Sequence, residues 1–264
     1  MKGARCIHNN QFTDRTNEVA ISNQGLSLKI VSYRNALDID VLVDDKYISE
    51  HTSYYHFKHG SVSSPYHLSV YGAGFLGEGK YITRNNHRQT KAYRTWNSML
   101  ERCYSENKIY KCPTYVDCFV DESWHNFQIF AEWYHENYYS CDDERMCLDK
   151  DILFKGNKIY CPEKCILVPI RINSLFIKSN AARGDCPIGV SYQKSSNKYV
   201  AAISKIEQAT TLGRFSSVNE AFEKYKTEKE KYIKLVADEY RSKYKDFPQR
   251  LYDAMYEYEV DIND

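Results

Sequence analysis

The sequence predicts an α+β protein built from several small sheets and amphipathic helices. Apolar and polar residues alternate near the N-terminus, at positions 26–31 and 39–43, which favours strands. Apolar residues then recur at helical spacing between positions 93 and 134. Three more alternating runs lie within positions 189–215, and a long helical pattern follows them. A chain of 264 residues is long enough for two or three small domains.

These patterns divide the chain into four segments. We expect a β-rich N-terminal domain with a glycine-rich junction in residues 1–79 and a middle domain in residues 80–180. A sheet-and-helix domain follows in residues 181–245, and a C-terminal helix with an acidic tail in residues 246–264. In the first segment, the two alternating runs predict antiparallel strands. Positions 47–57 predict a third strand or an extended arm. Together these elements predict a small barrel. The four glycines of residues 67–79 predict a flexible junction, because no strand-to-helix transition follows as a phosphate-binding fingerprint requires.

The middle segment predicts two helices and then a strand-turn-strand-helix unit. One helix carries Tyr93, Trp96, Leu100 and Cys103 on one face; the second, entered near Ser123, carries Phe127, Phe130, Ala131 and Tyr134. Two short strands between positions 148 and 168 flank a Gly156-Asn157 turn, and residues 170–176 predict a short helix. This order of elements is the layout of a ββα-metal finger.

Spaced motifs run through residues 90–175. They comprise Trp96, Met99, Arg102, Cys103 and Tyr104; Cys118; Trp124, Asn126 and Phe127; Leu148, Asp149 and Lys150; Gly156 and Asn157; Tyr160, Pro162, Glu163 and Cys165. Over roughly 80 residues this stretch resembles the divergent HNH-endonuclease-like proteins of bacteriophages. The resemblance implies one divalent metal, which polarises a scissile phosphate, and one general base that activates water.

The catalytic residues that the resemblance implies are Asp149, Lys150 and Asn157. Lys150 stands where the family has a histidine, and an ammonium group on an exposed hairpin is a poor base at neutral pH. No histidine follows His135, so the base would be His125, His135 or a histidine of the N-terminal region. We therefore expect a DNA-binding protein on an HNH-like scaffold with weak or no nuclease activity. An active metal-dependent homing or nicking endonuclease is the alternative.

Two sets of residues are candidate metal ligands. Oxygen ligands for Mg²⁺ would come from Asp149, Asp151 and Glu163, with Asn157 orienting the loop. A structural Zn²⁺ would instead use three cysteines, Cys103, Cys118 and Cys165, although their spacing is not that of a standard zinc site. The other interpretation of these cysteines is that they are small apolar core residues.

The cysteine count also bears on the compartment. Nine cysteines, an odd number, follow a polar N-terminus without a signal peptide. We therefore expect free thiols in a reducing environment, the cytoplasm of an infected bacterial cell. No run of 18 apolar residues occurs, so we expect no membrane partner.

Residues 186–225 predict three strands and a helix. The strands are Gly189–Tyr192, Lys198–Ile203 and Thr210–Phe215, and Ser217 is placed to cap a helix, with Glu220 three residues later. This segment resembles an AP2-type DNA-binding domain. The resemblance rests on a Gly-Val strand, an aromatic-x-Ala-x-Ile strand and a Leu-Gly-x-Phe strand, followed by a helix. The resemblance implies that the sheet lies in the major groove of double-stranded DNA.

Charge identifies the candidate DNA contacts. Lys198 shares one face of its strand with Val200 and Ala202, so we expect that face to point outward while Tyr199 and Ile203 pack on the helix. The predicted contacts of this sheet are Lys194, Lys198, Lys205 and Arg214. A second basic run, residues 80–111, holds eight Lys or Arg against two Glu and predicts a phosphate track that includes Arg94 and Arg102.

The C-terminal region allows a different class of function. A helix is expected over 218–244 and another over 249–258, after Pro248. Residues 253–264 hold five acids and no base, which predicts a solvated tail. With a net charge of +1 and 24 tyrosines, the chain also suits an interaction protein that blocks a host protein, such as a defence or transcription factor.

Overall fold

The computed structural model describes residues 13–178, 185–205 and 208–263. Over these residues the protein is α+β, with several small sheets and short connecting helices, as predicted. The chain divides into two compact units between Lys80 and Tyr81. Among the described residues, no helix combines the length and the apolar character that crossing a membrane requires.

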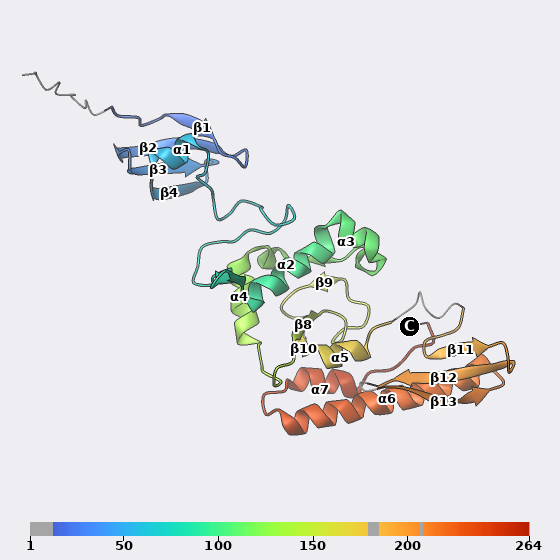
Figure 1. Ribbon diagram of the computed structural model, residues 1–264. Coiled ribbons are helices and arrows are strands. Elements are labelled where there is room, and N and C mark those ends of the chain that lie inside the picture. The colour runs from blue at the N-terminus through green and yellow to red at the C-terminus, as the bar shows by residue number, and fades with distance from the viewer. Residues whose placement is uncertain (1–12, 179–184, 206–207, 264) are drawn as a thin grey trace, which may run out of the picture. The chain divides into compact units, whose positions relative to one another are not determined.

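The N-terminal unit is an antiparallel meander followed by one helical turn (Figure 1). Its elements are β1 (Val19–Ile21), β2 (Ser27–Asn35), β3 (Asp38–Val43), β4 (Tyr47–Thr52) and α1 (Tyr54–Lys58). The antiparallel pairing of the first two expected strands is confirmed in β2 and β3. The expected barrel is wrong, because the sheet order β1-β2-β3-β4 leaves β1 and β4 as open edges.

Alternation explains the core of this unit. Every second side chain is buried in β3 and in the first half of β2, and α1 covers the same face of the sheet. The buried residues are Leu28, Ile30, Ile39, Val41, Val43, Phe57 and Val62. Ser53 begins α1 by accepting a hydrogen bond from the His56 backbone N–H at 3.2 Å, so the arm expected at 47–57 is a strand and then a helix.

The second unit begins with two helices that pack through aromatic side chains. Trp96 of α2 (Lys91–Tyr104) is fully buried, and its indole Nε1 donates a hydrogen bond of 2.7 Å to the Trp124 carbonyl. Helix α4 (Phe127–Glu136) supplies the facing rings. Short elements connect and flank these helices: β5 (Arg84–Asn85), β6 (Arg88–Gln89), α3 (Glu106–Lys111), η1 (Pro113–Tyr115), β7 (Phe119–Val120) and η2 (Glu122–His125).

The strand-strand-helix order is present, but its hairpin differs from the prediction. β8 (Met146–Asp149) pairs antiparallel with β10 (Ile166–Pro169), and α5 (Ile170–Leu175) follows directly. The strand after the Gly156-Asn157 turn, β9 (Ile159–Tyr160), pairs parallel with β7 instead of with β8. The turn therefore lies in the middle of a long loop, residues 150–165, that connects the end of β8 to the start of β10.

A three-stranded sheet and a long helix complete the second unit. β11 (Val190–Gln193), β12 (Lys198–Ser204) and β13 (Ala209–Phe215) are antiparallel, and α6 (Val218–Lys243) follows. The predicted cap is confirmed, since the Ser217 hydroxyl accepts from the Glu220 N–H at 3.2 Å. The sheet meets α6 so closely at Gly189, which has a φ of +75°, that a Cβ there would lie 2.0 Å from the Tyr225 ring.

One face of α6 contributes to two hydrophobic cores. In Figure 1 the sheet lies along one part of α6 and α7 along another part. Its first turns pack on the sheet through Ala221, Phe222 and Tyr225. Its later turns pack on β10, α5 and α7 (Gln249–Tyr256) through residues from Ile233 to Tyr240. The sheet, α6 and the segment formed by β8, β10 and α5, which we call the ββα segment, are therefore held together by a single apolar helix face.

The acidic segment expected to be a solvated tail is docked at Val260, whereas the described residues that follow it, 261–263, are exposed. Val260 is 3% exposed and belongs to the core between the sheet and α6. Its N–H donates to the Glu230 carboxylate at 2.9 Å, and the Lys155 ammonium donates to the Glu259 carbonyl at 3.2 Å. The acidic composition predicted solvation, but one apolar side chain and two backbone hydrogen bonds are enough to dock the segment.

Lys229 interrupts the apolar face of α6 between the two cores. It is 8% exposed, and burial lowers its pKa from 10.5 to about 8. Below about pH 8 the group is charged in both the folded and unfolded chains, so its desolvation cost is fully present; that cost declines as the pH rises toward 10.5. We predict that Lys229→Met raises the free energy of unfolding by about 2 kcal/mol at pH 7.

The measurement is urea unfolding of the full chain at pH 7 and at pH 10. The gain from Lys229→Met should be smaller at the higher pH, because the wild-type lysine is then largely neutral in the folded state. Lys231→Met, at an exposed position two residues away, is the matched control and should change stability little at either pH. An equal gain in both variants would show that burial of Lys229 is not the cause.

Candidate nucleic-acid interface

The face of the sheet that points away from α6 is polar and basic. Ala201 and Ile203 of β12 are buried toward α6, so alternation turns the neighbouring residues outward. With the cross-strand register, this outer face consists of Ser191, Gln193, Lys198, Val200, Ala202, Thr211 and Arg214. The strands β11, β12 and β13 contain no Asp or Glu. The outer face therefore carries cations without any acid on the same strands.

Neutral side chains hold the two cations of the outer face in place. The Arg214 Nε donates to the Gln193 Oε1 at 3.0 Å across the sheet. The Lys198 ammonium donates to the Ser216 hydroxyl at 2.8 Å. Arg214 is exposed, and neither cation forms an ion pair with a carboxylate within the described ranges. Both positive charges are consequently oriented but not neutralised.

The other two predicted contacts of the sheet lie elsewhere. Lys194 is exposed in the turn between β11 and β12, at the end of the outer face. The prediction for Lys205 needs correction, because its ammonium lies 5.6 Å from the centre of the Tyr232 ring on α6. That contact directs Lys205 to the helix side of the sheet, where the aromatic ring attracts its charge.

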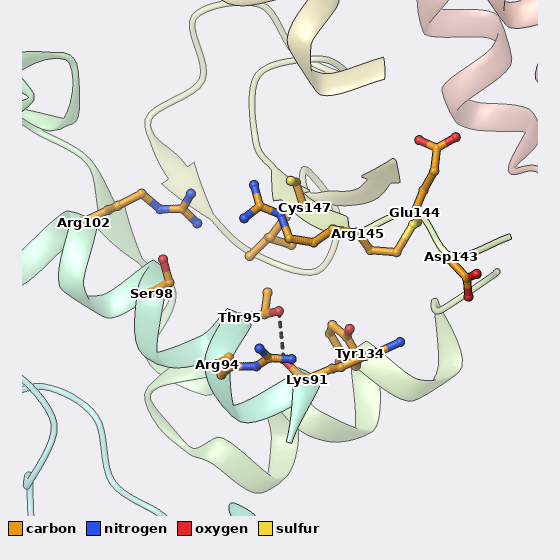
Figure 2. A pocket seen from close by; sticks show the side chains of 12 residues that line it. Lys91, Arg94, Thr95, Ser98, Arg102, Tyr134, Asp143, Glu144, Arg145 and Cys147 are labelled. Atoms are coloured by element: carbon orange, nitrogen blue, oxygen red, sulfur yellow. Dashed lines mark hydrogen bonds between the residues drawn. The ribbon is translucent and has the colours of Figure 1, made fainter. Parts of the chain in front are cut away.

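Arg94 and Arg102 do not follow a continuous basic track. The guanidinium carbon of Arg102 lies 5.7 Å from the centre of the Tyr115 ring and 5.3 Å from that of Tyr160, so the side chain is packed between the two rings. Arg94 is exposed about two turns earlier on α2. Both arginines line a pocket of about 490 Å³ between α2 and β8 (Figure 2).

Asp149 ends β8 by capping the turn that follows. One oxygen of its carboxyl group, Oδ1, accepts the backbone N–H groups of Asp151 and Ile152, both at 2.7 Å. Burial raises the pKa of this carboxyl group above its usual value, although the two N–H groups oppose the shift. The expected metal ligand is thus used as a local structural acceptor.

Lys150 and Asn157 tie the long loop together. The Lys150 side chain is buried, contrary to the exposed position expected, and its ammonium donates at 2.7 Å to the Asn157 carbonyl and to the Asp151 carboxylate. In return the Asn157 side-chain amide donates to the carbonyls of Lys150, at 2.9 Å, and Ile159, at 2.7 Å. Lys150 is buried because the Gly156-Asn157 turn folds back over the end of β8.

The proposed metal ligands are not brought together. Among the described residues, only Asp38, Asp40 and His51 form a group of three or more candidate ligands with ligand atoms within 4.8 Å of one another. The oxygen set of Asp149, Asp151 and Glu163 does not form such a group. Asp149 is committed to backbone N–H groups and Asp151 to Lys150, while Glu163 is exposed in the loop.

The three cysteines proposed for zinc are buried core residues. Cys103, Cys118 and Cys165 are 6%, 6% and 2% exposed, and they do not form a ligand group of the kind just described. Burial raises the pKa of the Cys103 thiol to about 12 and raises that of Cys165 as well. Zinc binds the thiolate, so these environments favour the apolar interpretation of the cysteines.

The acidic group in the N-terminal unit was not predicted. The Arg34 guanidinium donates to the carboxylates of Asp38, at 2.7 and 2.8 Å, and of Asp40, at 2.6 and 2.8 Å. These bonds hold the pKa of both carboxyl groups at about 2. His51 Nδ1 lies 2.9 Å from Asp38. Arg34 already supplies the positive charge that a metal ion would bring to this cluster.

The two candidate bases make local contacts. His125 Nε2 lies 3.1 Å from the Tyr104 hydroxyl, and the His135 ring stacks on Tyr81 with 5.1 Å between ring centres. Within the described part of the chain, no hydrogen bond or ion pair joins either histidine to Asp149.

Comparison with known proteins found no relative: no protein-family model, no curated protein and no solved structure matches this chain. The HNH-like and AP2-like resemblances therefore remain predictions from the quoted residues. Two further residues of interest, Gln193 and Arg145, were missed. Gln193 gains its importance from pairing across the sheet with Arg214, and Arg145 from facing α2 across the pocket. Neither relation has a signature in the local sequence.

Substitutions at Asp149 separate a structural acceptor from a metal ligand. We predict that Asp149→Asn keeps the free energy of unfolding at pH 7 within about 1 kcal/mol of wild type, because the amide oxygen can still accept both N–H groups. Asp149→Leu should lower it by about 1–2 kcal/mol, because two backbone donors, that of Ile152 partly buried, lose their acceptor.

The readout is chemical denaturation between pH 4 and pH 7. Because the folded-state pKa of Asp149 is raised, the wild-type contribution to stability falls as the pH rises from 3.8 through that pKa, and Asp149→Asn removes this trend. Equal damage from both substitutions would contradict the capping role.

Proposed function

We propose that this protein binds double-stranded DNA through the outer face of β11, β12 and β13. The observation that carries the proposal is an acid-free sheet face on which Arg214 and Lys198 are oriented by neutral partners and keep their charge. Electrostatic attraction to phosphates supplies much of the affinity of DNA-binding proteins, and acids on the same face would oppose it.

The size and chemistry of the face suit the major groove. Three strands spaced about 4.8 Å apart are roughly 10 Å across, and the groove is about 12 Å wide. Arg214 is exposed and can donate two hydrogen bonds to a guanine edge, and Gln193, held beside it, has the amide chemistry that reads adenine. Lys198, together with Lys194 in the turn, suits phosphate contacts that set the register of the protein on the duplex.

We infer that the ββα segment supports this surface without hydrolysing DNA. The atoms expected to do the chemistry hold the loop instead, since Asp149 caps a turn and the Lys150 ammonium has two protein acceptors. An ammonium group that donates to two protein acceptors has no lone pair with which to take a proton from water.

The proposal predicts different effects for the two outer-face cations. Arg214→Gln should weaken binding to a preferred duplex by about 1–3 kcal/mol and reduce discrimination among sequences. Lys198→Gln should weaken binding to all duplexes and lower the slope of log K against log salt by about 1. Fluorescence anisotropy with labelled duplexes at several salt concentrations measures both quantities.

Lys205→Gln is the matched control, because Lys205 lies on the helix side of the same sheet. It removes the same charge as Lys198→Gln but should leave the salt slope nearly unchanged. Equal slopes for all three variants and the wild type would place the DNA-binding surface elsewhere.

The inferred lack of hydrolysis has its own test. We predict that supercoiled plasmid incubated with the full chain stays intact in Mg²⁺ and in Mn²⁺, under conditions in which gel shifts show binding. The matching reaction in EDTA controls for contaminating nucleases. Metal-dependent nicking that disappears in Asp149→Asn would refute the scaffold interpretation and restore the endonuclease.

A further inference from the structure

A pocket of about 490 Å³ lies between α2 and the strand β8 (Figure 2). Its wall on the α2 side includes Lys91, Arg94, Thr95, Ser98 and Arg102, and its opposite wall runs from Asp143 to Leu148. Pockets of this volume are typical of small-molecule sites. It belongs to neither the outer face of the sheet nor the loop that Lys150 holds.

Three arginines give the pocket its chemistry. Arg94 and Arg102 approach from α2, and Arg145 approaches from the segment before β8, as Figure 2 shows. Where the chain is described, none of the three forms an ion pair with a carboxylate. Like charges that converge on one concavity repel each other unless an anion lies between them. We refer to the space lined by Arg94, Arg102 and Arg145 as the arginine pocket.

The remaining charged residues of the lining are directed elsewhere. Glu144 accepts a hydrogen bond of 2.6 Å from the Tyr240 hydroxyl of α6, and Figure 2 shows its carboxylate pointing away from the arginines. Asp143 is exposed at the rim. The Lys91 ammonium donates to the Tyr138 hydroxyl at 3.2 Å. The interior of the arginine pocket is therefore positive and not self-neutralised.

Arg102 is held rigidly in this position. Its guanidinium is packed between the rings of Tyr115 and Tyr160, and its Nε is buried without a hydrogen-bond partner. A guanidinium fixed in this way loses little further freedom when it binds an anion, which favours affinity. The hydroxyl group of Ser98, one turn earlier on α2, adds a neutral donor to the same wall.

We propose that the arginine pocket binds the phosphate groups of a nucleotide, either a free nucleoside polyphosphate or the 5′-phosphate end of a nucleic-acid strand. Guanidinium groups match phosphate oxygens in bidentate geometry, and convergence from two walls suits a compact group with several charges. The backbone of an intact duplex is convex, so it cannot bring a phosphate into a concavity whose arginines come from two opposite walls. This site is independent of DNA binding by the sheet.

Calorimetric titration of the full chain tests the proposal. The probes are pyrophosphate, dATP and two single-stranded oligonucleotides of one sequence, one with a 5′-phosphate and one with a 5′-hydroxyl end. We expect Arg94→Gln and Arg145→Gln, both at exposed positions, each to raise Kd about tenfold or more. Arg84→Gln, an exposed arginine of β5 outside the pocket, is the matched control and should leave Kd unchanged.

Comparison of the four probes identifies the source of the phosphate. Tight binding of dATP points to a free nucleotide, whereas a preference for the 5′-phosphate over the 5′-hydroxyl strand points to a strand end. Absence of binding to all four probes, or equal Kd values for the pocket variants and Arg84→Gln, would overturn the proposal. Arg214→Gln should leave pyrophosphate binding intact, so that a failure of the sheet as a DNA surface is distinguishable from a failure of the pocket.

Discussion

The buried face of α6 is the constraint on which the second unit depends. This helix has 26 residues, and its apolar side chains belong to two cores, one beneath the three-stranded sheet and one beside β10, α5 and α7. A helix of this length spans about 39 Å at 1.5 Å per residue, so both cores are held at fixed positions along one rigid element. The sheet is thereby positioned by the same element that completes the core of the ββα segment.

A second constraint acts within the long loop. The reciprocal hydrogen bonds of Lys150 and Asn157 close 150–165 on itself, and Asp149 caps the end of the preceding strand. These bonds satisfy the buried polar groups of an irregular segment that has little regular pairing of its own. The same residue types that a metal-dependent nuclease would use for chemistry here provide stability. Similar sequence motifs can thus serve a scaffold or a reaction centre, depending on where the polar atoms find partners.

The sequence was sufficient for most of the element positions. Alternation placed β11, β12 and β13, and the cap at Ser217 placed the start of α6, because both depend on neighbouring residues. Partners distant in sequence could not be predicted. β9 follows a strong turn signal yet pairs with β7, far earlier in the chain. The arginine pocket is of the same kind, since Arg145 and Arg102 are far apart in the chain and meet only through the packing of α2 on β8.

The docking of the last residues has an evolutionary consequence. Val260 fills the core between the sheet and α6, although the chain has passed through α7 before returning there. Residues 181–245 are therefore not a domain that recombination could transfer on its own. A protein that received only these residues would lack Val260, and the apolar side chains of α6 would be exposed. Shuffling events that preserve both cores would have to exchange the chain from β8 to its last docked segment as one block.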